Sequence, residues 1–115
     1  MKYLCLVYME PGALDRLSPE ARQRLDRDSQ DYDRKLMADG AFLAASALQP
    51  TRTARTLRVR QGRKSVTDGP FAETKEVLVG FIFVEASSMT AAEAIAEQIP
   101  MARYGTIEVR PELVF

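Results

Sequence analysis

The sequence predicts an α+β fold in which strands and two helices alternate along a chain of 115 residues. Three observations support this prediction. Several short apolar runs have the length of strands, two segments combine helical periodicity with capping signals, and glycine- and proline-containing turns separate them. An apolar content of 46% is enough for a core without disulfides or metals. We expect one domain over residues 1–115.

The first half of the chain predicts a strand, a long helix and a second strand. Lys2 to Tyr8 is apolar on both alternating faces, which is typical of a central strand. Ser18, Pro19 and Glu20 supply an N-cap, a proline at the first helical position and an acidic first turn, so a helix begins at Pro19. Asp39-Gly40 ends this helix. Ala41 to Leu48 is small and apolar and predicts a strand packed against it.

Apolar residues recur along this helix at the spacing of one buried stripe. The stripe comprises Ala21, Leu25, Tyr32, Leu36 and Met37. The charged residues between them predict a solvated face: Arg22, Arg24, Asp26, Arg27, Asp31, Asp33, Arg34 and Lys35.

The second half predicts a hairpin, a strand, a helix and a last strand. Arg55–Arg60 and Arg63–Thr67 form the hairpin, and Asp68-Gly69-Pro70 turns the chain sharply into an apolar strand over Val77–Glu85. Thr90 and Glu93 form a capping box. The second helix runs to about Ile99, where Pro100 stops it, and it buries Ala92, Ile95, Ala96 and Ile99. Thr106 to Arg110 alternates as the last strand.

This order is a βαββαβ plan with an inserted β-hairpin, whose commonest solution is the ferredoxin-like sandwich. In that architecture two helices cover one face of an antiparallel sheet. Lys2 to Tyr8 and Phe81 to Val84 are apolar on both faces, so the uncovered face would expose a larger apolar surface than monomers usually do. We therefore predict a homodimer in which two sheets pack face to face as a dimeric α+β barrel.

Composition excludes several function classes. Sixteen basic residues balance sixteen acidic ones, so bulk charge does not indicate a nucleic-acid partner. No apolar run approaches the roughly 20 residues of a membrane span, and no signal peptide is recognisable, so we expect a cytoplasmic protein without membrane contact. The chain lacks histidine and shows no metal or phosphate motif, so no metal or cofactor is expected. Cys5 lies inside an apolar strand, so we expect it to be an inert buried thiol.

Four segments carry a family resemblance over nearly the whole chain. They are Met1-Lys2-Tyr3-Leu4, Leu48-Gln49-Pro50, Val66-Thr67-Asp68-Gly69-Pro70-Phe71-Ala72-Glu73-Thr74-Lys75-Glu76 and Gly105-Thr106-Ile107-Glu108-Val109-Arg110-Pro111. In order and spacing the chain resembles the YCII-related superfamily, and specifically its DGPF-motif branch. The resemblance implies a dimeric α+β barrel, members that are mostly uncharacterised, and an association of the branch with extracytoplasmic-function sigma factors by gene neighbourhood or fusion.

One departure from the resemblance bears on chemistry. In some YCII-like proteins a histidine in the first helix and a later aspartate form an acid/base pair, but this chain has no histidine. Aligned on Gly40, the place of that histidine falls near Ser29. A histidine–aspartate dyad is therefore excluded, and with it the most direct proton transfer near neutral pH.

The remaining candidate site residues each have a structural alternative. Asp68 is a candidate base or ligand-binding carboxylate, but Asp before Gly-Pro is more often a turn former. Glu73 and Lys75 are candidates for binding a polar substrate, although such neighbours are more often a surface or intersubunit ion pair. Tyr8 and Tyr104 lie near strand ends, where a hydroxyl can face a cavity, although tyrosines at such a rim more often have structural roles. Arg103 and Arg110 are candidates for binding a carboxylate substrate, but Arg110 alternates to the polar side of its strand.

The loop residues Gly69, Pro70 and Phe71 are expected to shape the turn and contact a dimer partner. Two functions then stand side by side: a small-molecule-binding or regulatory module, and a lyase or isomerase with carboxylate and lysine acid/base groups. An exposed patch around Phe71 favours the module, and a closed pocket around buried Asp68, Glu73 or Lys75 favours the enzyme.

Overall fold

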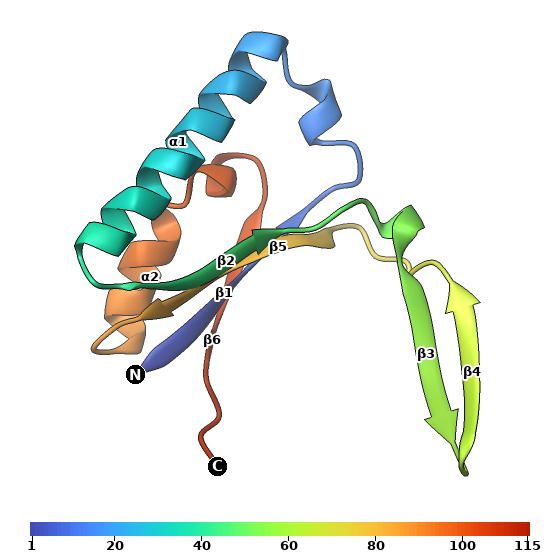
Figure 1. Cartoon of the computed structure of the whole chain (residues 1–115). Helices are drawn as coiled ribbons and strands as arrows, with labels where there is room; N and C mark the ends of the chain where they lie inside the picture. The colour runs from blue at the N-terminus through green and yellow to red at the C-terminus, as the bar shows by residue number, and fades with distance from the viewer.

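The computed structural model describes residues 1–115 and follows the predicted order of elements (Figure 1). The strands are β1 (Lys2–Met9), β2 (Phe42–Ala47), β3 (Arg55–Arg60), β4 (Arg63–Asp68), β5 (Val77–Glu85) and β6 (Thr106–Pro111). The α-helices are α1 (Pro19–Ala38) and α2 (Met89–Glu97). Three 3₁₀ turns connect them: η1 (Leu14–Arg16), η2 (Thr51–Thr53) and η3 (Pro100–Arg103).

Four strands form one antiparallel sheet in the order β2-β5-β1-β6. Both helices lie on the same face of this sheet (Figure 1). The strand order and the one-sided helix layer confirm the predicted ferredoxin-like α+β fold, with β1 and β5 as its two central strands. Neither helix combines the length and apolar composition that a membrane crossing requires.

The two faces of the central strands differ in burial because only one of them is covered. Along β1, Tyr3, Cys5, Val7 and Met9 are buried beneath the helices. The residues between them are half-buried and pair with β5 on the open face, Leu4 opposite Phe83 and Leu6 opposite Phe81. The core therefore lies between the sheet and the helices, while the opposite face carries large apolar side chains without cover.

Capping residues set the ends of both helices. Ser18 caps α1 as predicted, its Oγ accepting from the Ala21 N–H at 3.1 Å. For α2 the predicted capping box at Thr90 is wrong: the helix begins two residues earlier, where Ser88 Oγ accepts from the Ala91 N–H at 3.1 Å. The helix ends at Glu97, and the buried Ile99 leads into η3 instead of belonging to α2.

Two residues of α1 correct the predicted division between stripe and solvated face. Leu25 and Leu36 are buried as predicted, but Met37 is exposed. Asp33, which we expected on the solvated face, is half-buried. It lies eight residues after Leu25, a helical spacing that places the two residues near the same side of α1.

The β3–β4 hairpin stands apart from the main sheet as a two-stranded sheet of its own (Figure 1). Its base is tied by two hydrogen bonds, from the Gly69 N–H to the Ala54 carbonyl at 2.7 Å and from Thr56 Oγ1 to the Gly69 carbonyl at 2.8 Å. Its tip, Gln61-Gly62, has positive φ at both residues, as a tight hairpin turn requires. The projection raises the radius of gyration to 16.1 Å, against about 13 Å for a compact chain of this size.

Candidate functional site

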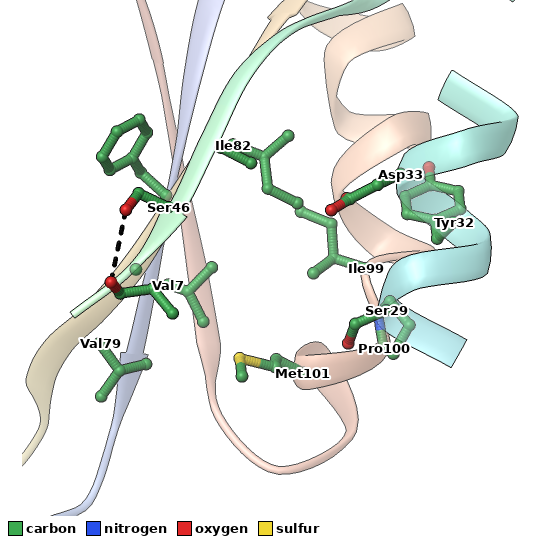
Figure 2. Close-up of a pocket in the computed structure, with 14 residues that line it drawn as sticks. Val7, Ser29, Tyr32, Asp33, Ser46, Val79, Ile82, Ile99, Pro100 and Met101 are labelled. Atoms are coloured by element: carbon green, nitrogen blue, oxygen red, sulfur yellow. Dashed lines mark hydrogen bonds between the residues drawn. The ribbon is translucent and has the colours of Figure 1, made fainter. Parts of the chain in front are cut away.

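A pocket of about 270 Å³ opens between α1, β2, β5 and η3, on the helix side of the sheet (Figure 2). Nine of its 14 lining residues are hydrophobic. The lining comprises Val7, Ser29, Tyr32, Asp33, Ala45, Ser46, Ala47, Val79, Gly80, Phe81, Ile82, Ile99, Pro100 and Met101. Its volume lies just below the range of typical ligand cavities, so it suits a small molecule.

Asp33 is the only ionisable carboxylate in this lining. It projects from α1 toward the sheet (Figure 2), and no hydrogen bond or ion pair in the protein involves its side chain. Burial raises the pKa of the Asp33 carboxyl above its ordinary value, because the surrounding apolar groups disfavour the charged form. The pocket thus presents one carboxylate whose hydrogen-bonding capacity is unused within the chain.

Ser29 and Tyr32 flank Asp33 on the same helix. Ser29 lies one turn earlier, so its hydroxyl and the Asp33 carboxylate line the pocket from successive turns of α1. The Tyr32 hydroxyl donates to the Ile95 carbonyl at 2.7 Å and so ties α1 to α2. Burial, with smaller contributions from Cys5, Asp39 and Glu97, raises the pKa of Tyr32 to about 12. The Tyr32 side chain is therefore uncharged at neutral pH and forms part of the pocket wall.

Apolar residues form the rest of the wall. Ile82 is a buried residue of β5, and Ile99 and Pro100 are buried where α2 passes into η3. Ser46 belongs to the β2 edge, but its side chain lies on the opposite side of the strand from Asp33 and donates to the Ala47 carbonyl at 3.4 Å (Figure 2). Within the pocket, the polar chemistry is therefore concentrated on one side, at α1.

Gly80 allows this part of the sheet to close tightly. A Cβ at Gly80 would lie 2.8 Å from the Ser46 carbonyl oxygen, so only glycine permits β5 and β2 to approach at this point.

A second hollow of about 340 Å³ adjoins the pocket and shares Ala47, Val79 and Met101 with it. Its outer wall carries charged residues from the β1–α1 connection and the first turns of α1: Glu10, Asp15, Arg22 and Asp26. Arg22 is paired with Asp26 at 3.4 Å. The apolar pocket thus continues into a polar vestibule. No cluster of three His, Cys, Asp or Glu side chains is arranged to hold a metal ion.

Comparison with known proteins decides the family. The whole chain, residues 1–115, matches the YCII-related domain. The chain belongs to the YCII-related family. It is also 37% identical over 113 residues to a protein of Rhizobium meliloti (strain 1021) that is described as uncharacterized; the match covers 96% of this chain and 91% of that protein.

The Asp68-Gly69-Pro70-Phe71 motif of this YCII-related chain lies at the foot of the hairpin and lines neither the pocket nor the hollow. Gly69 has a φ of +91°, which explains the glycine at this turn. The Asp68 side chain is 92% exposed and lies 3.3 Å from Arg55 Nε. Phe71 is 78% exposed, and Pro70 is also exposed.

The other predicted site residues lie apart from one another. Glu73 and Lys75 are exposed in the segment that leads to β5 and form no ion pair. Tyr8 is half-buried on the open face of the sheet, opposite Leu78. Arg103 is paired with Asp28 at 3.0 Å at the edge of a shallow polar depression beside α1. The structure therefore does not gather these five residues into one site.

Sequence reasoning missed Asp33 as a site residue of the YCII-related chain. The signal was present in the periodicity: Leu25, Ser29, Tyr32, Asp33 and Leu36 follow one another at helical spacing on one face. Ser29, near which the resemblance placed the histidine of some YCII-like proteins, lines the pocket. Cys5 is buried as predicted, and burial raises the pKa of its thiol to about 11.

Proposed function

We propose that this YCII-related protein is a homodimeric small-molecule-binding protein whose ligand occupies the α1–β5 pocket and contacts Asp33. The observation that carries the proposal is the half-buried Asp33 carboxylate, which faces an apolar pocket and has no partner in its own chain. The Asp33 oxygens still reach solvent, so a ligand can contact them, and carboxyl groups in a cavity whose pKa is shifted by burial concentrate at functional sites.

The chemistry of the lining defines the class of ligand. Apolar walls around Ile82, Ile99 and Met101 favour a compact, mainly apolar molecule. The Asp33 carboxylate accepts hydrogen bonds, so the ligand would present a hydroxyl or an ammonium group toward α1. A free carboxylic acid is disfavoured, because no cationic side chain lines the pocket.

The open face of the sheet supports the homodimer. Leu4, Leu6, Phe81 and Phe83 form paired rows on the face that the helices leave uncovered. The neighbouring residues of β6 carry charges of both signs: Glu108 lies opposite Leu6, and Arg110 lies opposite Leu4. A second copy related by a two-fold axis would bury the apolar rows against each other and place its charges at the rim.

The binding proposal is tested with small phenols, cyclic alcohols and cyclic amines in a thermal-shift screen, followed by calorimetry on the best compound. Asp33→Asn removes the negative charge at nearly constant volume. We expect it to weaken binding at least about tenfold, since a hydrogen bond to a charged group contributes about 1.5–3 kcal/mol. Asp31→Asn is the matched control, because Asp31 lies on the same helix but is exposed and paired with Arg34 at 2.7 Å.

Equal weakening by both variants, or by neither, would contradict the assignment of Asp33. Amide chemical shifts then locate the ligand independently: the proposal requires the largest changes at Ser29, Asp33 and Met101, which line the pocket from two elements.

A second candidate function is a lyase or isomerase, which the raised pKa of Asp33 favours because a carboxyl group with such a pKa exchanges protons closer to neutral pH. The test is Asp33-dependent hydrogen–deuterium exchange at carbon atoms next to the carbonyl of small ketones and lactones. Exchange that Asp33→Asn abolishes would support the enzyme, and binding without exchange would support the binding protein.

A regulatory role is compatible with the same pocket. Phe71 is exposed beside the foot of the hairpin, as expected for a contact with another macromolecule, whereas Asp68, Glu73 and Lys75 are too exposed to form a closed catalytic pocket. This arrangement favours a binding module over an enzyme built on those three residues.

A further inference from the structure

The β3–β4 hairpin has no packing partner within its own chain. Its two strands pair with each other only, in a register that runs from Arg55 opposite Asp68 to Arg60 opposite Arg63. Apart from the hydrogen bonds at its base, no helix or strand packs extensively against it. A lone two-stranded hairpin is marginally stable in water, so a partner outside the chain would be needed to hold this one in place.

The register gives the hairpin two different faces. Leu57, Val59 and Val66 lie on one face, between the Arg55–Asp68 pair and Lys64, and their side chains are 58%, 57% and 42% exposed. The opposite face carries Arg58, Arg60, Ser65 and Arg63. An exposed patch of three aliphatic side chains on a projecting element is typical of a protein–protein contact.

The hairpin also differs in charge from the rest of the chain. Residues 55–68 contain five basic residues and one acidic residue, a net charge of +4. The other 11 basic and 15 acidic residues leave the remainder of the chain at −4. The neutral total therefore conceals a positive projection and a negative body, so the hairpin is complementary in charge to the body of a second copy.

The direction of the hairpin matches this complementarity. It runs away from the sheet on the side opposite the helices, the same side toward which the C-terminal segment extends (Figure 1). A six-residue strand spans about 20 Å, whereas packed sheets lie about 10 Å apart. A second sheet seated on the open face would therefore lie beside the hairpin, and the tip would reach past it.

We propose that the β3–β4 hairpin is an arm that clasps a second copy of this chain, with Leu57, Val59 and Val66 packed against the partner. The inference rests on the homodimer proposed above and adds a contact outside the sheet-to-sheet interface. A nucleic acid is the less favoured occupant, because phosphate contacts would leave the aliphatic face exposed.

The test compares dimer dissociation constants by sedimentation over a range of protein concentrations. Leu57→Thr combined with Val66→Thr replaces two of the three aliphatic side chains by threonine, a β-branched residue suited to a strand. We expect the dissociation constant to rise at least about tenfold. Ser65→Thr, on the opposite face, is the matched control and should leave it unchanged. Added salt should weaken the wild-type dimer, since it screens the exposed charges of the arm.

The outcomes separate the two proposals. A wild-type monomer would overturn the homodimer and the arm together. A wild-type dimer whose dissociation constant the double variant does not change would overturn the arm alone. Binding of duplex DNA that the double variant leaves intact, but that Arg58→Gln with Arg60→Gln abolishes without altering the dimer, would overturn the arm in favour of a nucleic-acid contact.

A second measurement needs no variant of the arm. Lys64 is the only lysine of the hairpin, and a carbodiimide joins lysine directly to a carboxylate. In a mixture of unlabelled and ¹⁵N-labelled protein, the arm predicts Lys64 cross-links that join one labelled and one unlabelled peptide. Lys64 links found within single chains only would contradict it.

Discussion

At the scale of single residues, Asp33 shows what sequence reasoning could and could not find. It stands in a run of charged residues, and most of that run is solvated as predicted: Arg22, Arg34 and Lys35 are exposed. Asp33 differs because it shares the covered side of α1 with Leu25 and Leu36. Whether a polar residue at such a border is buried depends on η3 packing alongside, which local sequence does not determine.

Stability against pH gives a residue-scale prediction. Because the folded state raises the pKa of Asp33, it binds the proton more tightly than the unfolded chain does. Stability is therefore lost as pH rises from about 3.9, the ordinary pKa, through the folded pKa. Asp33→Asn removes this cost, so it should raise the free energy of unfolding at neutral pH, by less than about 1 kcal/mol because solvent screens a half-exposed group.

Chemical denaturation at two pH values measures this effect. The gain from Asp33→Asn should vanish below the ordinary pKa, where both the wild-type carboxyl and the amide are neutral. A variant that is less stable than wild type at neutral pH would contradict this prediction, because it would show that the fold stabilises the ionised form of Asp33. A variant that gains stability while losing ligand would mark a residue kept for binding.

At the scale of elements, the spacing of apolar residues, together with turn and capping signals, predicted every strand and both α-helices. The alternation of Thr106 to Arg110 predicted the last strand, and the double-sided apolar run of Lys2 to Tyr8 predicted a central one. The residue at which α2 begins was harder to predict. Ser88 and Thr90 are both good caps, and the structure uses Ser88.

Alanine substitutions at Ser88 and Thr90 test which of the two residues caps α2. Ser88→Ala should lower the free energy of unfolding by about 1 kcal/mol, because the Ala91 N–H loses its side-chain acceptor. Thr90→Ala should change it by less than about 0.5 kcal/mol, since Thr90 is exposed inside the helix and alanine is the better helix former. Urea denaturation measures the free energy of unfolding of both variants. A larger decrease for Thr90→Ala than for Ser88→Ala would indicate that Thr90 caps the helix after all.

The Asp68-Gly69-Pro70 turn shows the limit of motif reading at this scale. Its conformation was predictable, since the positive φ of Gly69 is what such a turn requires. Its place in the molecule was not, because whether a hairpin folds back on the sheet or projects from it depends on long-range contacts. The projection makes Asp68 a surface residue paired with Arg55 and leaves the pocket to α1.

At the scale of the whole molecule, the two faces of the sheet differ in the way that the proposed homodimer requires. Its helices cover one face of the sheet, its other face carries rows of Leu and Phe, and a positively charged hairpin projects on that uncovered side. The overall extents of 46 × 43 × 19 Å describe a thin, angular body that leaves few residues fully buried. In the proposed homodimer, a second copy would cover the open face of the sheet and lie beside the hairpin.

The homodimer is the claim on which the arm depends, and sedimentation equilibrium at micromolar concentration tests it most directly. We predict a mass of twice the 12.9 kDa chain and a shift to single-chain mass when Phe81→Asp places a charge on the open face of the sheet. A wild-type protein that sediments with a mass of 12.9 kDa across the concentration range would contradict it.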